Sequence, residues 1–330
     1  MAAMLPVTLV SRALLAPMSG VTDIVMRRIA ARFGAGLVVS EMVASDEFVR
    51  GSEESRLRAE GAGISPHVVQ LAGCDPHWLG EAARLAEANG AAIVDINMGC
   101  PAKKVTGGWA GSALMRDLDH AVSLVEAAVT AVKVPVTVKM RLGWDDASRN
   151  APELARRAVA SGARLITVHG RTRQQFYKGV ADWAAIRAVR AVGDFPLVAN
   201  GDIHGLDDAR ACLAQSGADL VMVGRAALGK PWLVGAIGAG LDGRTVPAPT
   251  LAQKHAVARE HYEGLLSLLG KAHGVRHARK HLAAYADEAT QSGGTPDAEA
   301  RRLLLTTDDP AQALAALAGL FSPACGRAAA

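Results

Sequence analysis

The sequence has few cysteines, and no two of them have the spacing of a metal site. The four in 330 residues are Cys74, Cys100, Cys212 and Cys325. Scattered thiols of this kind do not form a disulfide framework, so they indicate a reducing compartment. The chain also lacks a transmembrane run, because its longest apolar region, 219–241, contains Arg225, Lys230 and several glycines.

The N-terminus makes a poor signal peptide. It is apolar, but it has no basic segment, and Pro6 and Arg12 interrupt it. We therefore expect a cytoplasmic protein that makes no membrane contact. The formal net charge of +4 is a mild basic bias, compatible with an anionic partner.

Apolar segments recur along the first two thirds of the chain. Half of all residues are apolar, which excludes global disorder. Eight short runs have the character of buried strands, at 13–17, 37–41, 68–72, 92–97, 136–140, 165–169, 196–200 and 220–224. Alanine-rich amphipathic stretches between them predict helices, so the pattern favours a parallel sheet in a (β/α)8 TIM barrel. The alternative is a doubly wound open sheet, which the absence of GxGxxG after the first run disfavours.

The pattern changes at the segment VPAP, residues 246–249. Helical stretches follow it, without any candidate strand, and its two prolines are typical of a linker. We therefore expect two domains, a TIM-barrel domain over 1–245 and a small all-helical C-terminal domain over 246–330.

Polar or otherwise distinctive residues stand at the ends of most predicted strands. Catalytic groups of such barrels gather at the carboxyl ends of the strands. Singly, each residue could simply cap a strand or helix; together at one rim they predict a binding site. They are Ala16, Pro17, Met18, Gln70, Asp95, Asn97, Cys100, Lys139, Arg141, His169, Arg171, Asn200, Gly201, Asp202, Gly224 and Arg225.

The last two strand ends indicate what binds there. They carry glycine-rich backbone and Arg225, and exposed amides and a guanidinium both suit a phosphate. Lys139 could meet an anionic ring, and Gln70 could pair with ring carbonyl or imide groups. A phosphate joined to a planar heterocycle fits flavin mononucleotide (FMN).

Cys100 stands apart from the other cysteines. Most buried thiols are inert, and Cys74, Cys212 and Cys325 fit that description. Cys100 follows a predicted strand between Gly99 and Pro101, in a turn that would lift it towards the bound ring. Such a thiol could act as a proton donor or as a nucleophile.

Seven segments resemble those of one enzyme family, and they occur in the same order along the chain. They are LLAPMSGVTD (14–23), DINMGCPAKKV (95–105), AGSALMRD (110–117), VKMRLGWDD (138–146), TVHGRTRQQFYKG (167–179), ANGDI (199–203) and MVGRAALGKPW (222–232). They are similar to the bacterial tRNA-dihydrouridine synthases (Dus), in particular the DusB/NifR3-like subfamily. GVRHARKHLAAY (274–285) extends the resemblance into the helical tail.

The resemblance implies a flavoenzyme that reduces particular D-loop uridines of tRNA to 5,6-dihydrouridine with NADPH or NADH. It implies hydride transfer from FMN N5 to uracil C6 and protonation of C5 by Cys100. It assigns FMN binding to eleven of the strand-end residues. They are Ala16, Pro17, Met18, Gln70, Lys139, His169, Asn200, Gly201, Asp202, Gly224 and Arg225. Asn97, Lys139, Arg141 and His169 would lie around the uracil, which must leave its stack.

A basic stretch, residues 271–281, carries no acidic side chain. Within it Arg276, Arg279 and Lys280 share one helical face, which is typical of a solvated surface, but the resemblance assigns them to tRNA. Further cations around the cavity mouth would extend the tRNA surface: Lys103, Lys104, Arg171, Arg173 and Lys178. The three histidines of the stretch lack a nearby carboxylate or thiol in the sequence, so no metal site is predicted.

Three other functions fit parts of the pattern; one of them, a barrel lyase without flavin, would be excluded by a yellow preparation. An FMN barrel acting on a small pyrimidine would share the flavin residues, but it leaves the basic tail unexplained. An RNA-binding or regulatory protein without catalysis would not need both Cys100 and Lys139. The sequence indicates no obligate protein partner.

Overall fold

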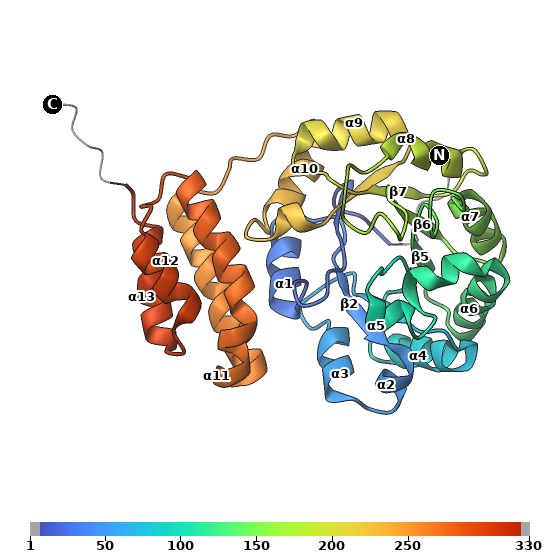
Figure 1. Ribbon diagram of the computed structural model, residues 1–330, viewed down its shortest axis with the longest axis horizontal. Helices are drawn as coiled ribbons and strands as arrows, with labels where there is room; N and C mark the ends of the chain where they lie inside the picture. Colours follow the sequence, from blue (N-terminus) through green and yellow to red (C-terminus); the bar gives the residue numbers. More distant parts are fainter. Residues whose placement is uncertain (1–6, 325–330) are drawn as a thin grey trace.

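The computed structural model describes residues 7–324, apart from the side chain of Lys104, and its centre is one parallel eight-stranded sheet (Figure 1). The strands are β1 (Ala13–Leu15), β2 (Val39–Ala44), β3 (Val68–Ala72), β4 (Ile93–Met98), β5 (Val136–Arg141), β6 (Leu165–His169), β7 (Leu197–Asn200) and β8 (Leu220–Val223). β1 pairs with β8, and Leu15 forms a parallel bridge to Val38, just before β2, which closes the ring. The predicted (β/α)8 barrel is confirmed.

Helices surround this barrel and connect its strands. They are α1 (Ile24–Arg32), α2 (Ser45–Val49), α3 (Glu53–Ala59), α4 (Pro76–Ala88), α5 (Lys103–Thr106), η1 (Gly111–Arg116), α6 (Leu118–Ala131), α7 (Ala151–Ala160), α8 (Trp183–Arg190), α9 (Leu206–Ser216), η2 (Arg225–Ala227) and α10 (Leu233–Leu241). Local sequence explains several of their ends. Asp75 caps α4, whose first residue is Pro76, and Gly217 ends α9 with a left-handed φ of 68°.

The alternation of side chains along each strand divides the barrel interior into two zones. A cluster that includes Leu14, Val68, Ile93 and Leu165 fills the zone near the strand starts. Successive residues of a strand face opposite sides, so the residues two and four positions further along also point into the barrel. These inward-facing residues are polar. These polar residues are Gln70, Asp95, Asn97, Thr137, Lys139, Arg141, Thr167, His169 and Asn200, at the carboxyl rim of the barrel.

Three helices follow the barrel: α11 (Leu251–Gln291), α12 (Ala298–Thr306) and α13 (Pro310–Leu320). Helix α11 is two helical arms joined at Gly270, whose φ of 72° reverses the chain. Figure 1 shows the two arms side by side next to α1, with α12 and α13 on their outer side. The expected helical tail is confirmed, whereas the domain boundary at 245/246 stays a prediction. Within residues 7–324, no helix is long and apolar enough to span a membrane.

Gly235 marks a close approach between α10 and the end of α1. A Cβ atom at this position would overlap the carbonyl oxygen of Phe33. We expect Gly235→Ala to lower the free energy of unfolding by about 2 kcal/mol, because backbone must move to admit the methyl group. Chemical denaturation measures this change.

Gly319→Ala is the matched control. Gly319 is an exposed residue of α13, and a Cβ atom added to it would meet nothing within 4 Å. Alanine should be neutral or slightly stabilising there, because it favours helix more than glycine does. Equal effects of the two substitutions would contradict the proposed steric cause.

Candidate functional site

A cavity of about 450 Å³ opens at the carboxyl rim of the barrel. Every residue that the sequence analysis assigned to the cofactor lines it: Ala16, Pro17, Met18, Gln70, Lys139, His169, Asn200, Gly201, Asp202, Gly224 and Arg225. Asn97, Cys100 and Arg141 line it as well. Residues from seven strand ends thus meet in one space, and their roles in binding stay predictions.

A chain of buried hydrogen bonds runs under one side of the cavity. Thr137 Oγ1 donates to Asp95 Oδ1 (2.5 Å), and Gln70 Nε2 donates to Asp95 Oδ2 (2.7 Å). Asn97 Nδ2 in turn donates to Gln70 Oε1 (2.7 Å). Burial raises the pKa of Asp95, more than the hydrogen bonds from Gln70 and Thr137 lower it. The chain fixes which way both amide side chains face, so their remaining donor and acceptor positions are preset for a ligand.

The same chain shapes the turn that carries Cys100. Asn97 Oδ1 accepts hydrogen bonds from the backbone N–H groups of Gly99 (3.2 Å) and Cys100 (2.9 Å). On the other side, Ser112 Oγ donates to the Cys100 carbonyl (2.9 Å). Gly111 (φ 60°) packs so closely that a Cβ atom there would lie 3.2 Å from the Cys100 Cβ. The thiol is therefore held at the cavity wall by Asn97 and by the segment 111–112, half-buried.

Positive charge gathers next to the amide chain, on β5, where Lys139 is the register partner of Asn97. Burial, and then the charge of Arg141, lower the pKa of Lys139 to about 8, so the ammonium group is charged at pH 7 and loses its proton as pH rises through that value. Lys139 Nζ donates to Asn200 Oδ1 (3.2 Å), and Asn200 Nδ2 donates to the Met222 carbonyl (2.7 Å). The second bond fixes the orientation of the Asn200 amide, which presents its oxygen to the lysine.

Two further basic groups complete this side of the cavity. Burial lowers the pKa of Arg141 to about 10, and its guanidinium donates to the carbonyls of Gly99, Thr172 and Phe176. Burial, followed by the nearby cations led by Lys139, lowers the pKa of His169 well below its usual value. His169 is therefore neutral at pH 7 and can both donate and accept a hydrogen bond.

Asp202, which follows β7, forms ion pairs with Arg171 and Arg225. It accepts two hydrogen bonds from Arg171 (2.9 and 2.6 Å) and one from Arg225 (3.3 Å). Burial raises its pKa, but Arg171 and the Ala181 N–H outweigh this effect, so the pKa lies below the usual value and the group is ionised. Asp202 adopts a left-handed φ of 51° beside Gly201 (φ 122°), where a Cβ atom would lie 2.7 Å from that of Ala181.

The structure does not bring all predicted tRNA residues to the cavity. Arg171 is buried under the rim, with its guanidinium held by Asp202 and by the carbonyls of Lys178 and Gly179. Lys103 is exposed on α5, and the neighbouring Lys104 has its side chain outside the described part of the structure. The contacts of all three with tRNA stay predictions.

The predicted basic face on the second arm of α11 is only partly free. Arg276 and Lys280 are exposed, whereas Arg279 pairs with Asp308 (2.8 Å). Lys280 reaches the loop between β1 and α1, since a Cβ atom on Gly20 would lie 2.6 Å from its Nζ. The face therefore lies beside the loop that supplies Met18 to the cavity.

The structure adds aromatic residues that the sequence analysis did not assign. Phe176 and Tyr177 line the cavity and are 41% and 45% exposed. The guanidinium of Arg225 lies 4.9 Å from the centre of the Tyr177 ring. The local signal was an aromatic pair in the loop after β6, but only the fold shows that this loop covers the cavity mouth.

A second aromatic group forms a row outside the cavity. Arg116 lies between two tryptophan rings, 5.3 Å from the centre of Trp109 and 5.0 Å from that of Trp144. Arg173 covers Trp144 at 4.8 Å. The Trp109 side chain is 59% exposed, so it stacks on an arginine at the surface and is not packed into the core.

The fold and the site define a barrel enzyme with a cationic rim cavity and a thiol in its wall. Comparison with known proteins then identifies the family. The family model described as "Dihydrouridine synthase (Dus)" matches residues 14–321. The chain belongs to the dihydrouridine synthase family and is an oxidoreductase, which confirms the resemblance inferred from the seven segments.

Several curated relatives cover nearly the whole chain. A probable tRNA-dihydrouridine synthase of Rhizobium leguminosarum bv. phaseoli is 54% identical over 93% of this chain and 94% of its own. The tRNA-dihydrouridine synthase B of Xanthomonas axonopodis pv. citri is 46% identical over 92% and 94%. A solved 2-naphthoyl-CoA reductase shares the fold at 13% identity, with a TM-score of 0.54 over 71% of this chain and 50% of its own.

The pair of Asp202 and Arg171 gives a prediction about stability. Arg171 is 1% exposed, so Asp202→Asn would leave a buried guanidinium without its counter-charge. We expect this substitution to lower the free energy of unfolding by about 3 kcal/mol. Asp242→Asn, which breaks the exposed pair with Arg244 (3.2 Å), should cost less than about 1 kcal/mol. Denaturant unfolding compares the two, and similar losses would show that the Arg171 pair is not a special anchor.

Proposed function

We propose that this protein is an FMN-dependent tRNA-dihydrouridine synthase that reduces the C5–C6 double bond of specific D-loop uridines with NAD(P)H. The observation that carries the proposal is the cavity itself. It is lined by three cations, Lys139, Arg141 and Arg225, and by a turn that presents the Cys100 thiol. Family membership and the names of the relatives point to the same reaction.

The donor set of the cavity fits FMN. Its lining contains the cations Lys139, Arg141 and Arg225 and a single carboxylate, Asp202, which is already paired with Arg171. That excess of positive charge suits a phosphate and an anionic ring. A Cβ atom on Gly224 would have only Ala16 and Met18 nearby, both at 3.9 Å, so the backbone after β8 leaves space for a ligand. We assign the phosphate to Arg225 and the adjoining backbone, and the ring to Gln70, Lys139 and Asn200.

When bound and reduced, FMN supplies the hydride that C6 of uracil accepts. Cys100 then donates the thiol proton to C5, so that a C–H bond forms as the S–H bond breaks. The thiolate that remains lies in the field of both Lys139 and Arg141. These cations stabilise it until solvent returns the proton.

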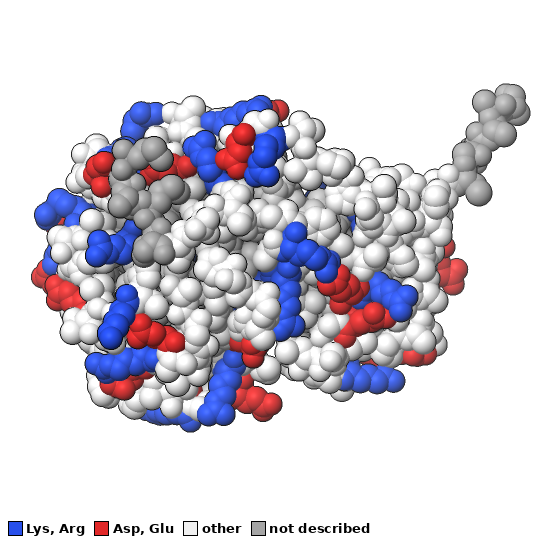
Figure 2. Space-filling view, turned by 180° about the vertical axis from the view of Figure 1, so that it is seen from behind, with Lys and Arg blue, Asp and Glu red and all other residues white. Residues whose placement is uncertain are grey.

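The outer surface of the cavity supports binding of RNA. The target uridine has to be unstacked to enter, and aromatic rings with arginines stack well on neighbouring bases. The row of Trp109, Arg116, Trp144 and Arg173 has this composition. The opposite view of the molecule, Figure 2, shows Lys and Arg interspersed with Asp and Glu, without a continuous basic patch on that face. We assign tRNA to the cavity mouth, beside the stacked arginine and tryptophan side chains, and to the exposed surface around Arg276.

The direct test is to incubate the purified protein with NADPH and tRNA that lacks dihydrouridine, and then to map dihydrouridine by position. Dihydrouridine at one or a few D-loop sites is expected. A yellow protein that oxidises NADPH and reduces a free pyrimidine, but leaves tRNA unchanged, would transfer the assignment to a small-molecule reductase.

Cys100→Ala tests the proton donor. The variant should retain FMN and accept hydride from NADPH, while dihydrouridine formation falls by about 10²-fold or more, because C5 lacks its acid. Cys74→Ala is the matched control, since Cys74 is also half-buried but does not line the cavity. Single-turnover reoxidation of the reduced flavin by tRNA separates the two steps, and full activity of Cys100→Ala would refute this role.

Arg276→Glu tests the tRNA surface. Loss of one phosphate contact should weaken tRNA binding several-fold and lower the dependence of log Kd on log salt by about one. Reduction of the flavin by NADPH should not change. Arg302→Glu on α12 is the control, because Arg302 is also exposed and lies outside the basic face. Equal tRNA affinities of the two variants would show that Arg276 is a solvent-exposed residue that does not contact tRNA.

A further inference from the structure

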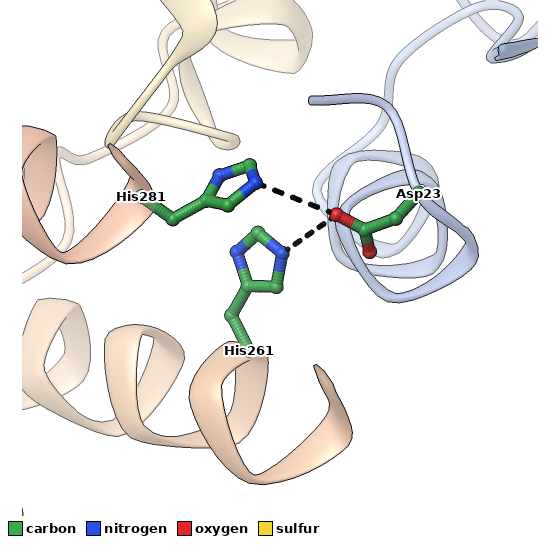
Figure 3. Close-up of side chains that lie close together, drawn as sticks. All are labelled: Asp23, His261 and His281. Carbon is green, nitrogen blue, oxygen red and sulfur yellow. Dashed lines mark hydrogen bonds and ion pairs between the residues drawn. The ribbon is translucent and has the colours of Figure 1, made fainter. Parts of the chain in front are cut away.

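A buried group of three side chains joins the barrel to the C-terminal helices (Figure 3). Asp23 lies at the start of α1, His261 on the first arm of α11 and His281 on the second arm. They are 7%, 0% and 2% exposed, and none of them lines the cavity. The proposed reaction therefore leaves this group without a role.

Two of the three side chains are oriented by other groups. Asp23 Oδ1 accepts from the N–H groups of Val25 (2.9 Å) and Met26 (3.0 Å), which leaves Oδ2 facing the histidines. His261 Nδ1 forms a hydrogen bond with the Tyr285 hydroxyl (3.0 Å), which leaves Nε2 facing Asp23. Metal-binding histidines and carboxylates are commonly held by outer partners in this way.

His281 has no such partner. Within residues 7–324, neither of its ring nitrogens forms a hydrogen bond, although the ring is almost fully buried. Its Nε2 points at Asp23 Oδ2 from 3.6 Å, within ion-pair range but too far for a hydrogen bond (Figure 3). A buried polar atom left unpaired in this way is costly, which indicates that another group satisfies it.

The spacing of the three atoms fits a cation. His261 Nε2 lies 3.1 Å and His281 Nε2 3.6 Å from Asp23 Oδ2, and one possible ligand atom from each of the three residues lies within 4.8 Å of the others. Bonds of about 2.0–2.2 Å in a tetrahedral zinc site separate the ligand atoms by about 3.3 Å. The two distances from the histidines to Asp23 Oδ2, 3.1 and 3.6 Å, lie on either side of this value. Rotation of the imidazole rings can adjust the distance between the two histidines.

We propose that Asp23, His261 and His281 form a structural divalent-cation site, with Zn²⁺ as its preferred ion. Two imidazoles and a carboxylate favour zinc over the oxygen-seeking Ca²⁺ and Mg²⁺. The ion links three segments, the start of α1 and both arms of α11. It thereby fixes the helical tail against the loop that supplies Met18 to the cavity.

The test uses the full-length protein purified with a tag that does not bind metal. Metal is removed with a chelator, Zn²⁺ is added back, and the bound zinc is measured by elemental mass spectrometry after desalting. About one equivalent is expected, together with a higher thermal midpoint. Co²⁺ in place of Zn²⁺ should give the visible absorption of a tetrahedral site. A wild-type protein that retains no zinc at micromolar concentration would overturn the proposal.

Variants assign the ion to these residues. His281→Ala should lose the bound zinc and the zinc-dependent rise in midpoint, whereas His273→Ala, on the same arm but exposed, should keep both. Asp23→Asn, which keeps a side-chain oxygen for the cap of α1, should also lose the zinc. Undiminished zinc in His281→Ala would place the ion elsewhere and refute the site. None of these readouts depends on dihydrouridine formation, so the proposed reaction can fail without affecting the result.

Discussion

The whole site depends on the closure of a parallel barrel. Leu15 of β1 is paired with Val223 of β8, and its N–H donates to the carbonyl of Leu37 on the other side (2.8 Å). Because every strand runs in the same direction, their inward polar positions converge on one rim. Burial at this rim, followed by the charge of Arg141, brings the pKa of Lys139 down to about 8.

That concentration of charge works against folding, and the structure compensates with local partners. The guanidinium of Arg141 is held by three backbone carbonyls, and Asp95 accepts hydrogen bonds from Gln70 and Thr137. Each bond offsets part of the desolvation of a buried charge. The polar rim rests on the apolar layer around Leu14 and Val68, so the barrel interior is apolar at the strand starts and polar at the strand ends.

Much of this arrangement could be predicted from the sequence, because it follows from local patterns. Strand ends are local signals, and barrel geometry brings them together, so most residues that line the cavity can be named from the sequence. Long-range partners were not predictable in the same way. The sequence placed Asp202 at the cofactor, but its bonds to Arg171 appear only in the folded chain. Likewise, the sequence shows no carboxylate near His281, because Asp23 is distant along the chain and adjacent only in space.

The contact between His261 and Asp23 spans 238 residues. A ribosome makes the β1–α1 loop well before the helices that cover it. The loop that supplies Met18 to the cavity therefore stays uncovered until the barrel and then α11 have been synthesised. The two arms of α11, by contrast, meet across the short reversal at Gly270 and can pair as soon as they emerge. Assembly of the cavity rim is thus coupled to synthesis of α11, and a chain truncated before α11 lacks the support on which that loop rests.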